Sequence, residues 1–154
     1  MYKRQVLLLA GRGDLEESIR ARVDELGLKK AVFFLGVVDD VPRLLRAADV
    51  FVFPSINEGL ALSVVEAQAS GLPTIASTGV PELAVVSDRV CRMPLSSGVE
   101  AWATECVDKL RFSLSSERSD ACDQIREHGF DVADTSVRLA AFYETAKKGD
   151  CAQW

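Results

Sequence analysis

Short apolar runs alternate with amphipathic segments over the first two thirds of the chain. The first run, QVLLLAG (5–11), ends at a glycine and is typical of a strand buried on both faces. The next segment, DLEESIRARVDELGL (14–28), has apolar residues at helical spacing and predicts a helix that ends near Gly27. The alternation then continues. We predict further strands at 31–36, 49–55, 73–77 and 89–94, helices at 40–48 and 60–71, and a turn of helix at 81–86.

The pattern changes after Gly98, where helical segments follow one another without strands. We predict helices at 99–114, 116–129 and 132–148. The sequence contains no internal repeat and no linker, so we expect a single domain over residues 1–154. Its sheet portion would span about 5–94 and its C-terminal helices about 98–148.

Five strands that alternate with helices indicate an α/β fold with a parallel sheet, because parallel neighbours need long crossover connections. We expect those crossovers to be right-handed. We therefore predict a Rossmann-like, three-layer domain. Ligands of these sheets bind beyond the carboxyl ends of the strands, so we expect the site there.

Composition excludes several classes of protein. The chain has 154 residues, a net charge of −5 and no basic run longer than two residues, which argues against nucleic-acid binding. No apolar run approaches the ~20 residues of a membrane span, and the first run is too short for a signal peptide. We expect a cytoplasmic protein. The four cysteines are far apart and the only histidine is His128, so we expect reduced thiols and no metal site.

The segment PSINEGLALSVVEAQASGLPTIAST (54–78) holds two acids, Glu58 and Glu66, separated by seven residues. Both fall at the predicted carboxyl edge of the sheet. Ser63 and Glu66 have the spacing of a capping box, which would make Glu66 a purely structural residue. Alternatively, the helix N-terminus would bind a diphosphate and the Glu66 carboxylate would accept hydrogen bonds from ribose hydroxyls.

Other motifs indicate packing rather than chemistry. AGRGDLE (10–16) lacks the third glycine of a dinucleotide-binding loop, since Glu16 stands there, and so a dehydrogenase is disfavoured. His128 precedes Gly129 near a helix end and is interpreted as a C-terminal cap. Trp102, Phe142 and Tyr143 are at helical spacing and are expected in the core.

The segment FLGVVDDVPRLLRAADVFVFPSINEGLALSVVEAQASGLPTIAST resembles the nucleotide-sugar-binding C-terminal domain of retaining GT-B glycosyltransferases of family four, also called group 1. The family signature is a glutamate, seven residues and a second glutamate within PS-x-x-E-G. The resemblance covers about residues 5–145. The matching residues are Glu58, Gly59, Leu60, Leu62, Glu66, Ala67, Gly71, Pro73 and Ala76.

The resemblance implies a role for each matching position. Glu58 would be catalytic, in contact with the donor sugar near its anomeric carbon, and Glu66 would bind the ribose. The backbone of residues 59–62 (Gly59, Leu60, Ala61 and Leu62) would face the sugar and the diphosphate. Val38, Asp40 and Arg43 would lie against the nucleobase. The implied donor is a UDP-, GDP- or ADP-sugar, transferred with retention and with no metal or other cofactor.

The sequence also departs from the family pattern. The family's N-terminal, acceptor-binding domain is absent, as is the first strand of the C-terminal domain with its G-R-L-x-x-x-K-G-like segment. Arg12 is no convincing substitute for the lost charges, and Ala61 replaces a usual glycine, which would crowd the donor sugar. We therefore expect the isolated chain to be inactive. A separate domain or chain would bind the acceptor, and the exposed former interface would favour self-association.

Two further expectations follow from the resemblance. The chain would be half of a GT-B fold, and its five strands would close the gap left by the absent middle strand in the order 2-1-3-4-5.

The alternative function is a non-catalytic nucleotide-binding or protein-interaction module derived from such a domain. A nucleotide-sugar epimerase or isomerase is disfavoured because only His128 offers an imidazole base.

Overall fold

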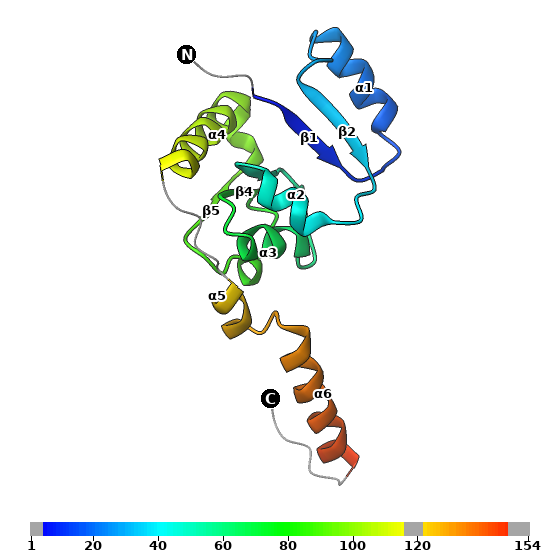
Figure 1. Cartoon of the computed structure of the whole chain (residues 1–154), viewed down its shortest axis with the longest axis vertical. Helices are drawn as coiled ribbons and strands as arrows, with labels where there is room; N and C mark the ends of the chain where they lie inside the picture. Colours follow the sequence, from blue (N-terminus) through cyan, green and yellow to red (C-terminus); the bar gives the residue numbers. More distant parts are fainter. Residues whose placement is uncertain (1–4, 116–121, 148–154) are drawn as a thin grey trace. The chain divides into compact units, whose positions relative to one another are not determined.

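The structure, a computed structural model, describes residues 5–115 and 122–147. Its elements are drawn in Figure 1. The chain divides into two compact units, one ending at Val41 and the other beginning at Pro42. All described strand pairings are parallel, and helices follow the strands. The α/β class predicted from the alternating pattern is therefore confirmed.

The first unit is a strand–helix–strand motif. Strand β1 (Leu7–Ala10) pairs with β2 (Val32–Gly36), and helix α1 (Glu16–Glu25) connects them. The Arg20 guanidinium lies 4.0 Å from the centre of the Phe34 ring, so α1 covers the face of the sheet that carries Phe34. Gly27 follows the helix with a φ of 67°, a conformation that glycine adopts without strain.

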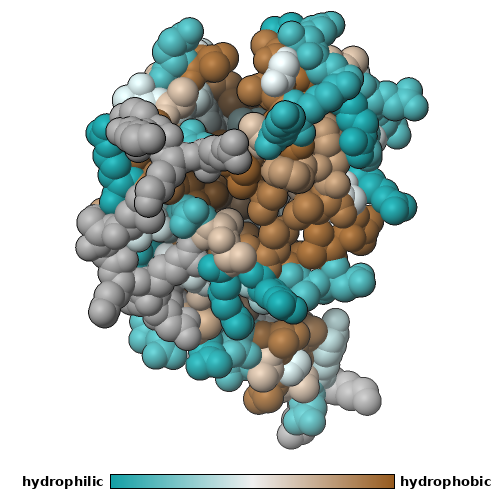
Figure 2. All heavy atoms as spheres, turned by 45° about the horizontal axis from the view of Figure 1, so that its top comes forward, coloured by the Kyte–Doolittle hydropathy of each residue, from teal (hydrophilic) through white to brown (hydrophobic). Residues whose placement is uncertain are grey.

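The opposite face of the same small sheet is open. Leu8 and Phe33 are partners in the β1–β2 register, and Leu35 lies two residues further along β2, so the three share that face. Phe33 is 46% exposed and Leu8 is 36% exposed. Hydrophobic atoms are also exposed in the space-filling view of Figure 2. We call Leu8, Phe33 and Leu35 the open face.

The second unit is built on a three-stranded parallel sheet in the order β3-β4-β5. Its strands are β3 (Phe51–Phe53), β4 (Thr74–Ser77) and β5 (Val90–Met93). The central strand β4 is buried at every position, as expected for a strand between two neighbours, although Thr74 and Ser77 at its ends are polar. The connection from β3 to β4 carries helix α3 (Leu62–Ala69).

Short helices complete the second unit. Helix α2 (Val41–Ala47) begins at the unit boundary, and two 3₁₀ turns flank β5, η1 (Glu82–Ala84) and η2 (Leu95–Ser97). The helical segment predicted at 81–86 is thus a single 3₁₀ turn. The later helices are α4 (Gly98–Ser115), α5 (Cys122–Glu127) and α6 (Val132–Lys147). Residues 116–121 and 148 of the predicted helices lie outside the described residues.

The aromatic residues predicted in the core are less buried than the helical spacing suggested. Tyr143 is 62% exposed on α6. Trp102 is half-buried and its indole N–H donates to the Pro94 carbonyl, while Phe142 packs against Tyr143. Helical periodicity identified one side of each helix, but it carries no information on whether another element covers that side.

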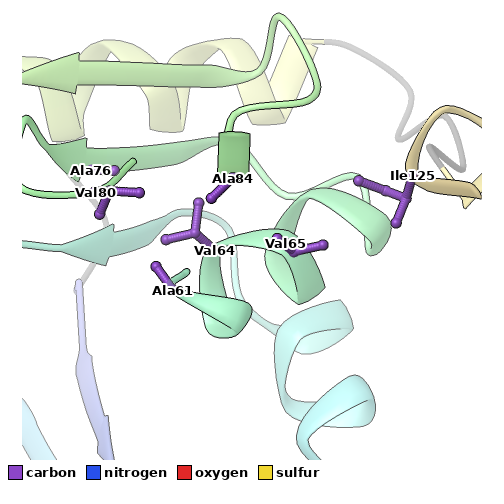
Figure 3. Close-up of a cluster of buried hydrophobic side chains, with 7 residues drawn as sticks. All are labelled: Ala61, Val64, Val65, Ala76, Val80, Ala84 and Ile125. Atoms are coloured by element: carbon purple, nitrogen blue, oxygen red, sulfur yellow. The ribbon is translucent and has the colours of Figure 1, made fainter. Parts of the chain in front are cut away.

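A small apolar cluster holds α3 against the sheet. Figure 3 shows its side chains directed toward one another from α3, β4, η1 and α5. Gln68, fully buried beside it, donates to the Ala84 carbonyl and accepts from the N–H groups of Val86 and Ser87. The position of α3 is therefore fixed both by apolar packing and by one satisfied buried amide. The cluster residues are Ala61, Val64, Val65, Ala76, Val80, Ala84 and Ile125.

The predicted strand order 2-1-3-4-5 is wrong in one respect. The pairs β1–β2, β3–β4 and β4–β5 are present, but within the described residues the strands form two sheets and no ladder joins β1 to β3. A β1–β3 ladder needs two strand edges about 4.8 Å apart along their length, and the two strands belong to different compact units. The local strand–helix–strand packing is retained instead.

Candidate functional site

Glu58 lies in the loop that follows β3, at the carboxyl edge of the three-stranded sheet. Its carboxylate accepts a hydrogen bond from the Ser55 hydroxyl, with 2.7 Å between Ser55 Oγ and Glu58 Oε1. Both residues are half-buried. The loop thus presents a carboxylate that is already held at one oxygen.

The loops after β3 and β4 are locked together. The Glu58 N–H donates to the Gly79 carbonyl at 3.1 Å, and the buried Ser77 hydroxyl donates to the Ser55 carbonyl. A Cβ on Gly79 would lie only 2.3 Å from the Ile56 carbonyl oxygen, so only glycine permits this approach. Residues more than twenty positions apart therefore fix the backbone of Glu58.

Arg92 on β5 braces the second of these loops. Its guanidinium donates to the carbonyls of Val80 at 2.8 Å and Thr78 at 3.2 Å, and it pairs with Glu82 at 3.1 Å. The carbonyls that it binds flank Gly79, which in turn accepts the Glu58 N–H. Arg92 therefore supports the site by holding the loop after β4, and not by direct contact with Glu58 or Glu66.

Helix α3 begins at Ala61, directly after the Glu58 loop. Ala61 has φ 58° and ψ 58°, the left-handed conformation, and is the one non-glycine residue with positive φ in the described parts of the chain. Ala61 is only 7% exposed and belongs to the apolar cluster. The Ala61 methyl group thus packs into the cluster. This argues against the expectation that it would crowd a donor sugar.

The capping-box interpretation of Glu66 is wrong. Ala61 occupies the N-cap position and no side chain caps the helix there. Ser63 is consequently the second residue of α3, so the box is out of register with the helix start. The exposed Glu66 carboxylate has no hydrogen bond or ion pair with other described residues. It lies one turn after the start of α3, a helix whose initial N–H groups lack intrahelical partners.

Gly59 is required neither for backbone conformation nor for space within the chain. Its φ lies outside the left-handed range, and a Cβ placed on it would have no atom within 4 Å. Leu60 beside it is half-buried, and Leu62 is exposed. A side chain at position 59 would therefore project into open space.

The remaining predicted site residues are distributed over both units. Val38 is half-buried and Asp40 is exposed in the first unit, and Arg43 is exposed on α2 in the second. The structure brings Glu58, Gly59, Ala61 and Glu66 together on one loop and helix. It adds Ser55, Ser77, Gly79 and Arg92, which the sequence interpretation missed. A T-G dipeptide after a buried strand and an arginine within an apolar strand were the available signals.

The thiols are separate from this site. Burial raises the pKa of Cys91, and the neighbouring Glu105 raises it further. Burial likewise raises the pKa of Cys106. Both are free thiols, as is Cys122, whereas Cys151 lies outside the described residues. Thiols with raised pKa values are poor nucleophiles near neutral pH.

The described helices include none that is both long and apolar enough to cross a membrane. The fold and site define a Rossmann-like domain in which the loop after β3 and the helix α3 that follows it each present a glutamate. The family model for glycosyl transferases group 1 matches residues 2–111. The chain belongs to this family and is a C-terminal domain of the GT-B type.

Comparison with known proteins agrees with this assignment. The chain is 33% identical over 145 residues to the putative glycosyltransferase EpsF of Bacillus subtilis, covering 94% of this chain and 38% of EpsF. It is 41% identical over 73 residues to an Escherichia coli enzyme, UDP-Gal:alpha-D-GlcNAc-diphosphoundecaprenol alpha-1,3-galactosyltransferase, covering 47% of this chain and 19% of that enzyme. The chain thus spans well under half the length of these relatives.

Solved structures show the same fold. The sucrose-phosphate synthase of Thermosynechococcus elongatus superimposes with a TM-score of 0.78 at 23% identity, covering 94% of this chain and 39% of that one. HepE of Anabaena, crystallised with UDP and glucose, gives a TM-score of 0.71 at 22% identity, covering 91% and 40%. These likenesses establish the architecture alone.

Proposed function

We propose that the chain is the donor-binding domain of a retaining glycosyltransferase that uses a nucleotide-diphosphate sugar. The observation that carries the proposal is the combination of Glu58, held by Ser55 and the locked loops, with Glu66, which lies one turn after the start of α3 and does not cap it. A side chain at Gly59 would project into open space. A helix N-terminus with exposed N–H groups attracts a diphosphate, so the ligand would lie along this loop.

Each residue has a role in the proposal. Glu66 accepts hydrogen bonds from the vicinal hydroxyls of the ribose, and Glu58 contacts the donor sugar near its anomeric carbon. The backbone of residues 59–62 (Gly59, Leu60, Ala61 and Leu62) faces the sugar and diphosphate. Val38, Asp40 and Arg43 lie against the nucleobase. The chain's residues stabilise the departing diphosphate with preorganised donors rather than with a metal ion.

The acceptor site is assigned to another domain or chain. The relatives are more than twice as long as the matched region, which supports a function shared with a second domain. We propose that the isolated chain is inactive in transfer, that it is cytoplasmic, and that it retains donor binding. An alternative is a non-catalytic interaction module, favoured by the exposed apolar residues of the open face.

Calorimetric titration of the purified chain with UDP, GDP and ADP tests the proposal. UDP is the first choice because HepE was crystallised with it. We expect saturable binding of one nucleotide, and loss of at least about tenfold in affinity in Glu66→Ala, because two charged hydrogen bonds are removed. The matched control is Glu127→Ala, an exposed acid on α5 that should bind like the parent.

Two outcomes would contradict the proposal. Binding of none of the three nucleotides would remove the donor role and favour the interaction module. Binding that Glu66→Ala and Glu127→Ala leave equally intact would show that the nucleotide is held elsewhere on the chain.

A further inference from the structure

We propose that Ser55 is a positioning residue for Glu58: its hydroxyl holds one carboxylate oxygen so that the other faces the donor sugar. The inference rests on the proposed function, because it assigns Ser55 to the sugar-binding part of the same site. Ser55 itself touches no reacting atom in this scheme and acts only through Glu58.

The hydrogen bond has the geometry of a strong, charge-assisted interaction. Ser55 Oγ lies 2.7 Å from Glu58 Oε1, whereas its distance to the Asn57 carbonyl oxygen is 3.4 Å. A serine hydroxyl has a single hydrogen to donate, and the shorter bond to a carboxylate is the stronger one. The hydroxyl is therefore committed to Glu58.

Both ends of this hydrogen bond are anchored to the same neighbouring loop. The Ser55 carbonyl accepts from the buried Ser77 hydroxyl, and the Glu58 N–H donates to the Gly79 carbonyl. Ser77 in turn accepts from the Gly79 N–H at 3.3 Å. A glutamate side chain loses conformational entropy when it is ordered, and here the protein has ordered it before a ligand arrives.

The arrangement predicts an effect that is selective for one part of the ligand. Ser55 and Glu58 belong to the loop after β3, whereas Glu66 is placed separately by the packing and buried amide of α3. Loss of the Ser55 hydroxyl would release the Glu58 side chain and leave Glu66 where it is. Binding of the sugar should weaken while binding of the nucleotide is unchanged.

The experiment compares UDP with UDP-glucose, titrated calorimetrically into the parent chain, Ser55→Ala and Ser55→Thr. If the parent selects GDP or ADP, the pair becomes GDP with GDP-mannose or ADP with ADP-glucose. We expect Ser55→Ala to bind the sugar nucleotide roughly five- to tenfold more weakly, with less than about a twofold change for the free nucleotide. Ser55→Thr keeps the hydroxyl and should restore the parent's ratio.

Controls separate positioning from general damage. Ser136→Ala removes a hydroxyl that bonds a backbone carbonyl on α6 and should bind both ligands like the parent. If Ser55→Ala fails to fold, Ser55→Cys replaces it, since the thiol is similar in size and a weak donor. The same selective loss is expected there.

The outcomes distinguish the inference from the function on which it rests. Equal weakening of both ligands, or no weakening, in Ser55→Ala would overturn the role of Ser55 while the donor site stands. A parent chain that binds no nucleotide and no sugar nucleotide would overturn the proposed function, and the inference with it.

Discussion

The two glycines beside Glu58 serve different purposes, although the sequence alone makes them look alike. Gly79 permits the loops after β3 and β4 to touch, since a Cβ would lie 2.3 Å from the Ile56 carbonyl oxygen. Gly59 meets no such restriction and has open space above it. Gly79 is therefore a structural glycine, whereas the open space at Gly59 leaves room for a ligand.

Substituting each glycine with alanine should give opposite results. Gly79→Ala forces the two loops apart and should lower the free energy of unfolding by about 2–3 kcal/mol. Gly59→Ala should change stability by less than about 0.5 kcal/mol yet weaken nucleotide-sugar binding, because its methyl group enters the ligand's space. Urea unfolding and calorimetry measure the two effects. Equal destabilisation by both substitutions would contradict this distinction.

Ala61 stores backbone strain at the start of α3. Its left-handed conformation costs an L-residue roughly 1–2 kcal/mol, which glycine avoids. Ala61→Gly should therefore raise the free energy of unfolding by at most about 1 kcal/mol, because the gain is reduced by loss of a buried methyl group and by the entropy that glycine adds to the unfolded chain. Ala69→Gly, at an ordinary helical position of the same helix, should instead destabilise. Urea unfolding of both variants is the measurement, and a stability loss in Ala61→Gly would contradict the argument.

Sequence reasoning found the residues of the site that lie close together in the chain. Glu58 and Glu66 follow from one motif, and their place at the carboxyl edge follows from the strand pattern. The contact of Ser77 with Ser55 joins residues 22 positions apart through a close loop approach, for which no local pattern exists. The failure of the Ser63 cap has a similar cause, since the left-handed Ala61 shifts the helix start.

At the scale of elements, helix ends depend on side chains that the hydrophobic pattern ignores. Helix α6 is capped by Asp131, whose carboxylate accepts from the Ala133 N–H at 2.8 Å and from Arg126 Nε at 3.0 Å. The hydrogen bond from the Ala133 N–H lowers the pKa of Asp131 below its ordinary value, and the hydrogen bond from Arg126 lowers it further. The ionised carboxylate is thus the form that stabilises the start of α6.

The sign of the pH dependence follows from that depressed pKa. The contribution of Asp131 is complete above its ordinary pKa of 3.8 and is lost as the pH falls through the lower, folded-state pKa. Circular dichroism of the parent and Asp131→Ala should differ in helicity near neutral pH. The two should converge below the pKa of the carboxylate. A difference that persists in strong acid would show that ionisation of Asp131 is not its cause.

Most strands and helices were predictable because the spacing of apolar residues within each segment is enough to identify it. Strand β2 falls in an unbroken apolar run, and the α1 segment has helical spacing with a glycine after its end. The absence of a β1–β3 ladder was not predictable, since whether two strand edges meet is not encoded in the period of either strand. The 3₁₀ turn at η1 is likewise set by the loop that Arg92 and Gln68 hold, and not by propensity.

For the whole molecule, the main feature is apolar surface that the described residues leave exposed. The open face presents Leu8, Phe33 and Leu35 to solvent, and β1 and β3 have no described neighbour on one side. Uncovered sheet faces and unpaired strand edges promote association between chains.

We therefore expect the purified chain to self-associate at high concentration. Phe33→Lys places a charge on the open face and should shift sedimentation equilibrium toward the monomer. Leu15→Lys, at an even more exposed apolar position outside that face, serves as the control. Equal behaviour of the two variants, or a monomeric parent, would contradict a role for the open face.

The bond between the Glu58 N–H and the Gly79 carbonyl has a consequence for following the site by spectroscopy. A single amide belongs to the residue proposed to meet the donor sugar and also closes the junction of two loops. Its hydrogen–deuterium exchange rate therefore measures how often that junction opens, with no ligand present. One slowly exchanging resonance would report the integrity of the site in every variant.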